Sequence, residues 1–593
     1  MLVVLIAGVV LGGYVLWSTM NVPEPETVTE VPAPPPEIRE IPPVEIPDVR
    51  FTDVTQEAGI IFVHENGANG EKLLPETMGG GCAFFDYDND GDPDILFVNS
   101  KRWPWDMRPA SKPATLALYQ NDGSGRFKDV TTGSGLDVSV YGQGAAVGDY
   151  DNDGNVDVFL SAVGSNRLFR NLGNGKFVDV TKAAGIAGSE TAWSTSCGWF
   201  DFDNDGDLDL FVCNYIVWRK DYDLAQNFQL TGGGRAYGRP QDFQGTYPYL
   251  YRNDGNGKFT DVSKFAGVQV QNNDTGEPLA KSLGVTFDDF NRDGWLDIVV
   301  ANDTVQNLLF LNQKNGTFLE IGAGSGVAFD SRGQARGAMG IDSSRFRNNQ
   351  EIGIAIGNFS NEMTSLYVAR DGMSFTDEAV SNGLGPVTRQ ELTFGLFFFD
   401  CDLDGRLDLF ASNGHLEEDI NIVQRSQHYA QPPQLLWNCG PEYETEFLPV
   451  PAEKCGKDFV KRIVGRGAAY ADIDGDGDLD LLIASVGRAP RLLRNDQQLA
   501  HHWLRFKLTG SKSNADAIGS IVEVTLNDGT ILTQQVMPTR SYLSQVELPV
   551  TFGLGTDTEV KSIRITWPSS KTMELSDLPI DQLHHIDEES ELR

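Results

Sequence analysis

Short apolar runs alternate with polar turn segments along residues 49–497. Runs such as Ile95–Val98, Leu210–Val212 and Ile298–Val300 are three or four residues long and follow segments rich in Asp, Asn and Gly. Short runs of this kind, bounded by turn-forming residues, are typical of buried strands. The pattern therefore predicts a chain of short strands connected by tight turns.

An acidic segment of nine residues precedes many of these runs and occurs six times. Oxygen-bearing side chains stand at positions 1, 3, 5 and 9, and Gly stands at position 6. Asp, Asn and Gly form turns without any ligand, but six copies with one spacing, and up to five carboxylates in nine residues, favour a counter-ion.

Calcium is the ion that this spacing predicts. It takes six to eight oxygens at about 2.3–2.6 Å, alternate side chains of a tight loop point inward, and the position 7 carbonyl adds an oxygen. We expect about six Ca²⁺ ions, one per loop, at the odd-numbered positions, which are Asp86, Asp88, Asp90, Asp92 and Asp94; Asp149, Asp151, Asp153, Asn155 and Asp157; Asp201, Asp203, Asp205, Asp207 and Asp209; Asp289, Asn291, Asp293, Trp295 and Asp297; Asp400, Asp402, Asp404, Arg406 and Asp408; and Asp472, Asp474, Asp476, Asp478 and Asp480.

A second signature follows most of the loops and completes a four-stranded repeat. LYQNDGSGRFKDVT from Leu118 and LYRNDGNGKFTDVS from Leu250 each read as two strands around an Asn/Gly turn. The gap between the fourth and fifth loops is twice the usual spacing, so we place a seventh, degenerate repeat at about Asp342 and expect it to bind no calcium. Four strands every 50–60 residues predict a propeller blade.

The two ends of the repeat region predict a closed ring. Phe51–Thr55 is an unpaired strand motif, and the last repeat ends at Leu492–Asn495 without its final strand. If the first strand completes the last blade, the ring has no open edge. We therefore expect an all-β, seven-bladed β-propeller over residues 49–497, with insertions at Trp218–Tyr247 and Glu417–Lys461 that either carry function or are surface decoration.

The segments on either side of the propeller have different characters. Residues 498–593 lack the acidic spacing but keep apolar alternation, which predicts a separate small β-sandwich-like domain. Residues 1–20 are apolar and predict a signal anchor or a signal peptide, and residues 21–48 are rich in Pro and Glu and predict an extended stalk. We expect the protein to be extracellular or periplasmic, with an N-terminal membrane anchor as its only membrane contact.

Six cysteines fit an exported chain. Cys197 and Cys213 flank the third loop at equal distances, and Cys439 and Cys455 share one insertion, so both pairs are candidate disulfides. Cys82 and Cys401 lie in apolar strands and are expected to be buried free thiols. Their spacing does not match a zinc site.

Composition excludes one class of partner. The 593 residues carry a formal net charge of −37, and 26 of the 84 acidic residues lie in the six loops. Even with six bound dications the charge would be about −25. Nucleic acid is therefore not expected as a partner, since no basic stripe is present to neutralise phosphates.

The combination of motifs resembles known families. The loop and hairpin unit closely resembles the FG-GAP/VCBS repeat, the calcium-binding blade of integrin α-subunit propellers. SNADAIGSIVEV from Ser513, SYLSQ from Ser541 and LPETMGGGCAFFDYDNDGD from Leu74 are similar to the cartilage acidic protein family with its C-terminal ASPIC/UnbV domain. The resemblance implies calcium binding and an extracellular or periplasmic location, and no established ligand or reaction.

Three functions follow as hypotheses. The first is a binding or adhesion scaffold for a protein or glycan, with calcium in a structural role. The second is a polysaccharide lyase or hydrolase on the propeller face, with His64 and His415 as candidate acid/base groups, although a His beside acidic residues is more often structural. The third makes the C-terminal domain the part that docks to a partner.

Overall fold

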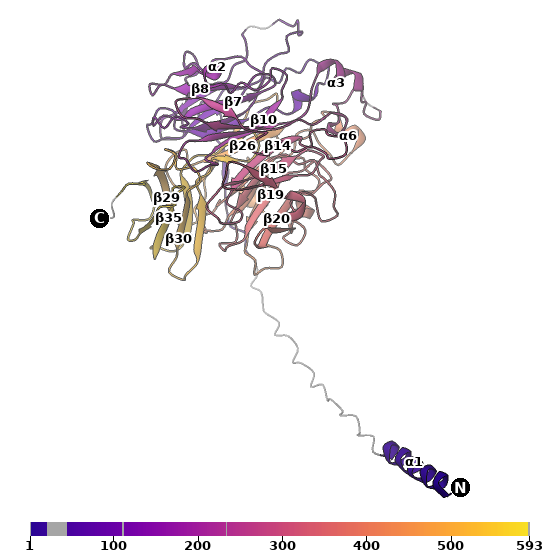
Figure 1. Ribbon diagram of the computed structural model, residues 1–593. Helices are drawn as coiled ribbons and strands as arrows, with labels where there is room; N and C mark the ends of the chain where they lie inside the picture. Colours follow the sequence, from indigo (N-terminus) through magenta and orange to yellow (C-terminus); the bar gives the residue numbers. More distant parts are fainter. Residues whose placement is uncertain (1, 21–43, 110–111, 233, 591–593) are drawn as a thin grey trace. The chain divides into compact units, whose positions relative to one another are not determined.

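A computed structural model of the protein describes residues 2–20, 44–109, 112–232 and 234–590. It divides into two compact units, residues 1–44 and residues 45–593. In the first unit, α1 (Leu2–Met20) is a helix (Figure 1). Among the described residues, no helix has the length and apolar character needed to cross a membrane. Residues 21–43 of the predicted stalk lie outside the described residues.

In the described part of the second unit, seven antiparallel sheets, each with four strands from the repeat region, follow one another along the chain. The first is formed by β2 (Cys82–Phe85), β3 (Asp94–Phe97), β4 (Ala117–Asn121) and β5 (Phe127–Asp129), the second by β6 (Gly142–Gly148), β7 (Asp157–Ala162), β8 (Arg167–Asn171) and β9 (Phe177–Asp179), and the third by β10 (Ser194–Phe200), β11 (Asp209–Asn214), β12 (Tyr249–Asn253) and β13 (Phe259–Asp261). The fourth contains β14 (Ser282–Asp288), β15 (Asp297–Asn302), β16 (Leu308–Asn312) and β17 (Phe318–Glu320), and the fifth contains β18 (Ile341–Ser344), β19 (Ile352–Ile356), β20 (Ser365–Asp371) and β21 (Ser374–Asp377). The sixth consists of β22 (Thr393–Phe399), β23 (Asp408–Asn413), β24 (Gln434–Asn438) and β25 (Phe447–Pro449), and the last of β26 (Gly465–Ala471), β27 (Asp480–Ser485), β28 (Arg491–Asn495) and β1 (Phe51–Asp53).

These sheets form a closed β-propeller, which confirms the predicted fold class. The innermost strand of each sheet contacts that of the next, and β26 of the last sheet contacts β2 of the first. Strand β1 pairs antiparallel with β28, with Phe51 opposite Asn495 and Asp53 opposite Leu493. Strand β1 therefore completes the last blade, as the motifs at the two ends of the repeat region predicted.

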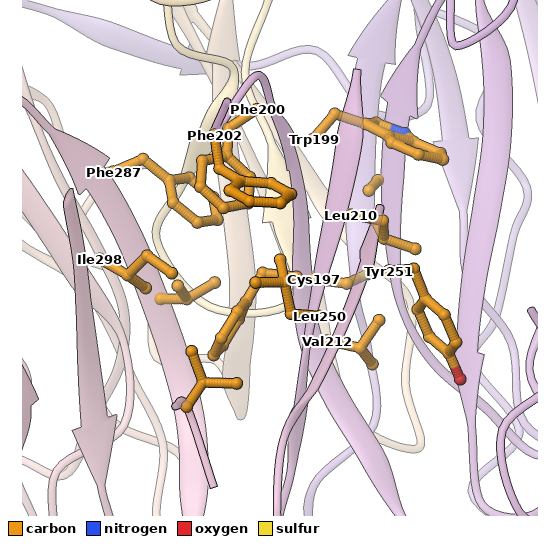
Figure 2. Close-up of a cluster of buried hydrophobic side chains, with 14 of the residues drawn as sticks. Cys197, Trp199, Phe200, Phe202, Leu210, Val212, Leu250, Tyr251, Phe287 and Ile298 are labelled. Carbon is orange, nitrogen blue, oxygen red and sulfur yellow. The ribbon is translucent and has the colours of Figure 1, made fainter. Parts of the chain in front are cut away.

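Aromatic side chains fill the space between neighbouring blades. Around the third blade, Phe200 and Phe287 stack with ring centroids 4.3 Å apart, and Trp199 is fully buried (Figure 2). Leu210 and Leu250 come from adjacent strands of that blade and belong to the same core cluster. Because alternate residues of a strand face opposite sides, each inner strand contributes to two such cores.

The C-terminal region contains two further sheets that share a core. One has the order β34 (Val550–Gly555), β29 (His502–Thr509) and β37 (Gln582–Asp587), and the other the order β31 (Ile531–Gln535), β30 (Ile521–Thr525), β35 (Ser562–Thr566) and β36 (Thr572–Leu575). Phe506, Val522, Phe552 and Trp567 are buried between them. Strands β29, β30 and β35 lie together in the yellow part of Figure 1.

The prediction of a separate C-terminal domain needs correction, because one of its hairpins belongs to the propeller. Strands β32 (Thr539–Arg540) and β33 (Ser544–Gln545) extend the first sheet, where Gln545 pairs with Ala83 of β2. Ser541 exchanges two backbone hydrogen bonds with Ile341 of β18, and the amide of Ala145 in β6 donates to the carbonyl of Leu543. Strands from all round the ring thus contact residues 539–545, which we call the axial plug.

Short helical segments occur in the connections between strands. They are η1 (Leu74–Thr77), α2 (Thr181–Ala184), α3 (Lys220–Gln226), η2 (Pro240–Asp242), α4 (Gly322–Ser325), α5 (Leu384–Thr388), α6 (Ile420–Val423) and α7 (Ala452–Cys455). Helices α3 and η2 lie in the predicted insertion Trp218–Tyr247. The predicted insertion Glu417–Lys461 was drawn too widely, because it contains β24 and β25, the two outer strands of the sixth blade.

The predicted disulfides are wrong, since all six cysteines are free and buried. The third loop closes with Phe200 opposite Asp209, so Cys197 faces Val212 and Cys213 lies on the other side of the sheet. In the second predicted pair, the Cys439 Sγ lies 3.0 Å from the carbonyl oxygen of Thr445, and the Cys455 Sγ lies 3.7 Å from that of Val450. The buried thiols predicted for Cys82 and Cys401 are confirmed.

Candidate metal centres

The acidic loops share a backbone conformation that the first Asp holds in place. In the third loop, the Oδ1 of Asp201 accepts from the amide of Asp205 at 3.2 Å, and its Oδ2 accepts from the amide of Gly206 at 3.0 Å. Asn204 at position 4 and Gly206 at position 6 have positive φ angles of 55° and 93°. Gly and Asn adopt this conformation most readily, which explains their places in the motif.

The last Asp of each loop begins the second strand, and in the third loop it is fixed from two sides. The Oδ1 of Asp209 accepts from the amide of Asn253 at 2.8 Å, and its Oδ2 accepts from the amide of Phe202 at 3.0 Å. The side chain of Asn253 in turn donates to the carbonyl of Tyr150 in the loop of the preceding blade.

Sequence reasoning missed the role of this Asn. Its signal was present, because an Asn ends the third strand of six blades, at Asn121, Asn171, Asn253, Asn312, Asn438 and Asn495. In each of these blades the backbone amide of this Asn donates to the position 9 carboxylate.

The structure brings the predicted ligands at positions 1, 3 and 9 together. Their carboxylate oxygens lie within 4.8 Å of one another in the first three loops, at Asp86, Asp88 and Asp94, at Asp149, Asp151 and Asp157, and at Asp201, Asp203 and Asp209. In the sixth blade, the carboxylate oxygens of Asp400, Asp402 and Asp404 also lie within 4.8 Å of one another. These groups could hold a divalent ion, and their all-oxygen chemistry suits calcium.

One oxygen in most of these loops lacks a hydrogen-bond partner. The position 3 Oδ1 is buried and unpartnered in Asp88, Asp151, Asp203, Asp402 and Asp474. The fourth loop differs, because the Oδ1 of Asn291 accepts from the amide of Asp293. A buried oxygen without a donor is costly, so a cation at this point would satisfy the same atom in five loops.

The electrostatics of the loops also favour a bound cation. Burial, with the neighbouring carboxylates, raises the pKa of Asp94 to about 8 and that of Asp157 to about 9. Burial raises the pKa of Asp201 to about 7, with Asp205 and Asp203 adding to the effect. Ionised carboxylates are therefore disfavoured here without a compensating charge, and a dication supplies that charge.

The position 7 side chains of the second and third loops accept from the preceding blade, and that of the loop in the sixth blade contacts a carboxylate of its own group. The side-chain amide of Asn89 donates to the Oδ1 of Asn155 in the next blade, and that of Asn152 donates to the Oδ1 of Asp207. Arg406 contacts Asp404 at 3.4 Å. Position 7 can therefore contribute its backbone carbonyl, which accommodates Trp295 and Arg406 at that position.

The C-terminal region packs directly on several of these loops. Arg505 of β29 forms buried ion pairs with Asp472 of the last loop and with Glu547, and the Lys507 Nζ lies 3.1 Å from the Oδ2 of Asp86. The Oδ2 of Asp516 accepts from the amide of Asp149 at 2.6 Å. The face that carries the loops is thus also the docking face of the C-terminal sheets.

The candidate catalytic histidines are buried. The Nδ1 of His64 accepts from the amide of Gly487, and the Nδ1 of His415 accepts from the amide of Glu417. Burial lowers the pKa of His64 to about 3 and that of His415 to about 4, and the guanidinium of Arg466 lowers both further. Their solvent exposures of 3% each leave little room for a substrate and indicate structural roles.

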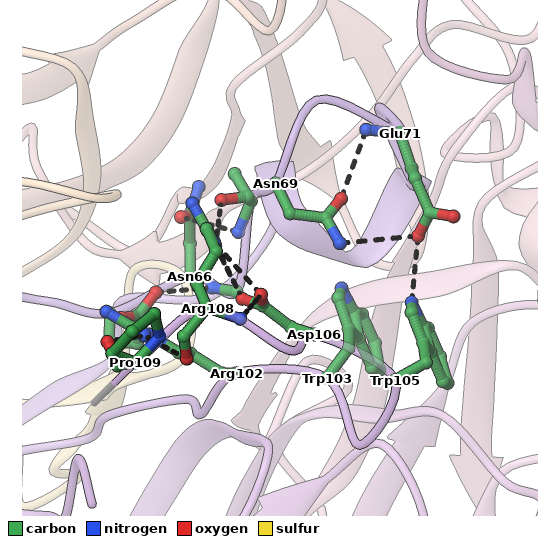
Figure 3. A network of polar contacts seen from close by, with 12 residues as sticks. Asn66, Asn69, Glu71, Arg102, Trp103, Trp105, Asp106, Arg108 and Pro109 are labelled. Carbon is green, nitrogen blue, oxygen red and sulfur yellow. Dashed lines mark hydrogen bonds and ion pairs between the residues drawn. The ribbon is translucent and has the colours of Figure 1, made fainter. Parts of the chain in front are cut away.

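An aromatic network occupies the loops around residues 64–109. Trp103 and Trp105 stack with centroids 5.0 Å apart, and the indole of Trp105 donates to Glu71 (Figure 3). The Lys220 Nζ also lies over the Trp105 ring, 4.1 Å from its centroid. The Trp105 ring therefore has two partners from within the chain, Trp103 and Lys220.

Comparison with known families identifies two kinds of module. The FG-GAP-like repeat matches residues 86–160, 149–212 and 289–342, and the ASPIC and UnbV family matches residues 510–593. Cartilage acidic protein 1 of Mus musculus is 29% identical over 290 residues, which cover 47% of this chain and 41% of that protein. The Xenopus tropicalis protein of the same name is 28% identical over 281 residues, 46% of this chain and 40% of that protein. The aligned region thus spans well under two thirds of these curated relatives.

Two of the solved structures with similarity to the chain each cover 70% of it. One is an Agrocybe aegerita lectin described as recognising non-reducing terminal N-acetylglucosamine, with a TM-score of 0.38, 13% identity, and coverage of 70% of this chain and 94% of that chain. The other is the Dos1 propeller, with a TM-score of 0.34, 9% identity, and coverage of 70% and 93%.

Proposed function

We propose, for a chain that carries FG-GAP-like repeats and a C-terminal ASPIC and UnbV domain, that it is an exported calcium-binding scaffold. The calcium ions stabilise the propeller, and the propeller acts as a scaffold that binds a protein or glycan ligand. One observation carries the proposal: carboxylate oxygens from positions 1, 3 and 9 lie within 4.8 Å of one another in three loops, and a position 3 oxygen is buried without a donor in five loops.

A structural role for the ions follows from the supply of ligands. Each loop offers carboxylates at several positions and a backbone carbonyl, so its own residues can fill most of a calcium coordination shell. A catalytic metal keeps an open position for substrate. The loop face is also covered in part by the C-terminal sheets, through Lys507 and Arg505.

The expected stabilisation is large enough to measure. Extracellular calcium modules have dissociation constants of about 10⁻⁴ to 10⁻³ M. At ~1 mM calcium, linkage gives about 0.4–1.4 kcal/mol per site, or about 2–8 kcal/mol for six sites. The free energy of unfolding of a whole domain is about 5–15 kcal/mol, so the calcium contribution is of comparable size.

Thermal unfolding with and without chelator tests the proposal. We expect a clear fall in Tm when EGTA removes calcium, and recovery when calcium is added back. Magnesium at the same concentration serves as the control, because it fits a flexible loop poorly and dehydrates reluctantly. An identical transition in EGTA and in calcium would refute the structural role.

A polysaccharide-acting enzyme is the second candidate function, and the site geometry does not favour it. His64 and His415 are both buried, and the axial plug fills the centre of the ring, where Tyr542 and Leu543 belong to a core cluster.

Export and an N-terminal anchor are proposed from the sequence of residues 1–48. Fractionation of cells expressing the full chain tests them.

A further inference from the structure

The fifth blade retains the shape of the acidic loop without acidic residues at positions 1, 3, 5 and 9. Asn348 has a φ angle of 51°, and its side chain donates to the carbonyl of Gly405 in the next blade. Asn152 and Asn204, both at position 4, donate in the same way to Gly206 and Gly294. Asn348 therefore occupies position 4 of a loop that runs over residues 345–353.

A second contact gives the same alignment. The side chain of Asn438 donates to the carbonyl of Phe346, as that of Asn253 donates to Tyr150 at position 2 of its loop. Arg345 thus stands at position 1 and Arg347 at position 3. The degenerate loop begins three residues after Asp342, which lies within β18 and pairs with Arg540 of the axial plug at 2.7 Å.

Arg347 forms ion pairs with three glutamates around this loop. Its Nη1 lies 2.8 Å from Glu351 at position 7, and its Nη2 lies 2.9 Å from Glu378 and 2.7 Å from Glu446 of the sixth blade. The Nε also donates to Glu446, so that pair is bidentate. The Arg347 side chain is 6% exposed, and those of Glu378 and Glu446 are 7% and 3% exposed.

We propose that the guanidinium of Arg347 takes the place of the divalent ion in the fifth blade. In five other loops a buried position 3 oxygen has no donor and an external cation would satisfy it, whereas here the cation is part of the chain and joins the fifth blade to the sixth through Glu446. A planar guanidinium suits this role because its fork can bind several carboxylates at once. The fifth blade is then independent of calcium, so chelation loosens the ring unevenly.

Substitution of Arg347 tests its role directly. Arg347→Met removes the positive charge beside the buried carboxylates of Glu378 and Glu446 and the partly exposed one of Glu351, so we expect Tm to fall by about 3–5 °C. The fall should be the same in calcium and in EGTA, because no ion can replace the guanidinium. Arg347→Lys keeps the positive charge but lacks the forked guanidinium, so its Tm should fall by a smaller amount. This variant serves as the test if Arg347→Met does not fold.

Arg332→Met is the matched control, because Arg332 is exposed in the connection that precedes the fifth blade. It should leave Tm unchanged. An Arg347→Met protein that melts like the control in EGTA would overturn the inference, and so would a loss that calcium reverses.

Hydrogen exchange of the full chain tests the uneven response. On adding EGTA, we expect exchange in peptides covering residues 194–214 to rise at least tenfold, and exchange in residues 341–356 to rise less than twofold. Equal loss of protection in both would contradict the inference. This comparison rests on the calcium function proposed above: if chelation changes neither peptide, that function fails, and the variants of Arg347 still decide the present inference.

Discussion

The hydroxyl of Tyr542 donates to the backbone carbonyl of Met78 at 2.8 Å, so two segments far apart in the sequence meet at the centre of the ring. Tyr542 belongs to the axial plug, and Met78 follows the buried turn η1. Both side chains lie in one core cluster with Leu543, Phe394 and Met339. The C-terminal region therefore contributes directly to the core of the propeller.

Removing the Tyr542 side chain should destabilise the whole ring. Tyr542→Ala deletes a fully buried aromatic residue and should lower the free energy of unfolding by about 3–5 kcal/mol. Tyr542→Phe removes only the hydrogen bond and should cost about 1 kcal/mol. Urea denaturation measures both, with Tyr222→Phe as a control, since Tyr222 is exposed. A Tyr542→Ala protein as stable as the control would mean that the plug is not part of the core.

An inner-strand glycine leaves space for the plug. A Cβ at Gly467 would lie 2.7 Å from the carbonyl oxygen of Gly80 and 3.0 Å from that of Tyr542. Since these atoms are backbone, Gly467→Ala should displace the plug and make it sensitive to limited proteolysis. Gly324→Ala is the control, because a Cβ there meets no atom within 4 Å. Equal cleavage rates for the two variants would rule out this account of Gly467.

The third loop offers a test of one calcium site. Asp203→Asn should reduce the number of bound ions by one and remove about 0.4–1.4 kcal/mol of the stabilisation by ~1 mM calcium. In EGTA the variant should be at least as stable as the wild type, because burial and Asp205 raise the pKa of Asp203 to about 6. Calorimetric titration and melting measure the two effects. Asp221→Asn, at an exposed Asp, should change neither.

Much of the fold could be predicted because each blade repeats a local pattern. The acidic spacing, the Asn/Gly turn and the orphan strand at Phe51 are signals within a few residues of the element they form. The axial plug had no such signal. SYLSQ at Ser541 is a short segment whose partners, such as Ile341 and Ala145, lie hundreds of residues away, so only the closed ring reveals its place.

The candidate site could be predicted for the same reason, and its gaps have a physical origin. Positions 1, 3 and 9 were found from spacing, whereas the partners that fix them come from other strands, as Asn253 does for Asp209. The fifth loop escaped detection at Arg345 because two arginines stand where the pattern expects acids. The spacing of acidic residues in the sequence identifies ligands that share a loop. It does not identify an arginine, such as Arg347, whose guanidinium takes the place of the divalent ion.

Acidification should destabilise the protein partly through its two buried histidines. With calcium saturating, lowering the pH from 7.5 to 5.0 protonates His64 and His415 in the unfolded chain, where their pKa is about 6.5, but not in the folded one, where burial lowers the pKa to about 3 and about 4. The contribution of these histidines to the free energy of unfolding is therefore fully present above pH 6.5 and is lost as the pH falls below it. The loss is about 2 kcal/mol per histidine at pH 5. His64→Gln, which can still accept from Gly487, should show a smaller loss between these two pH values than the wild type, measured by urea denaturation. His428→Gln, at an exposed position, should behave like the wild type, and a His64→Gln protein with the full wild-type loss would show that His64 is protonated in the folded state.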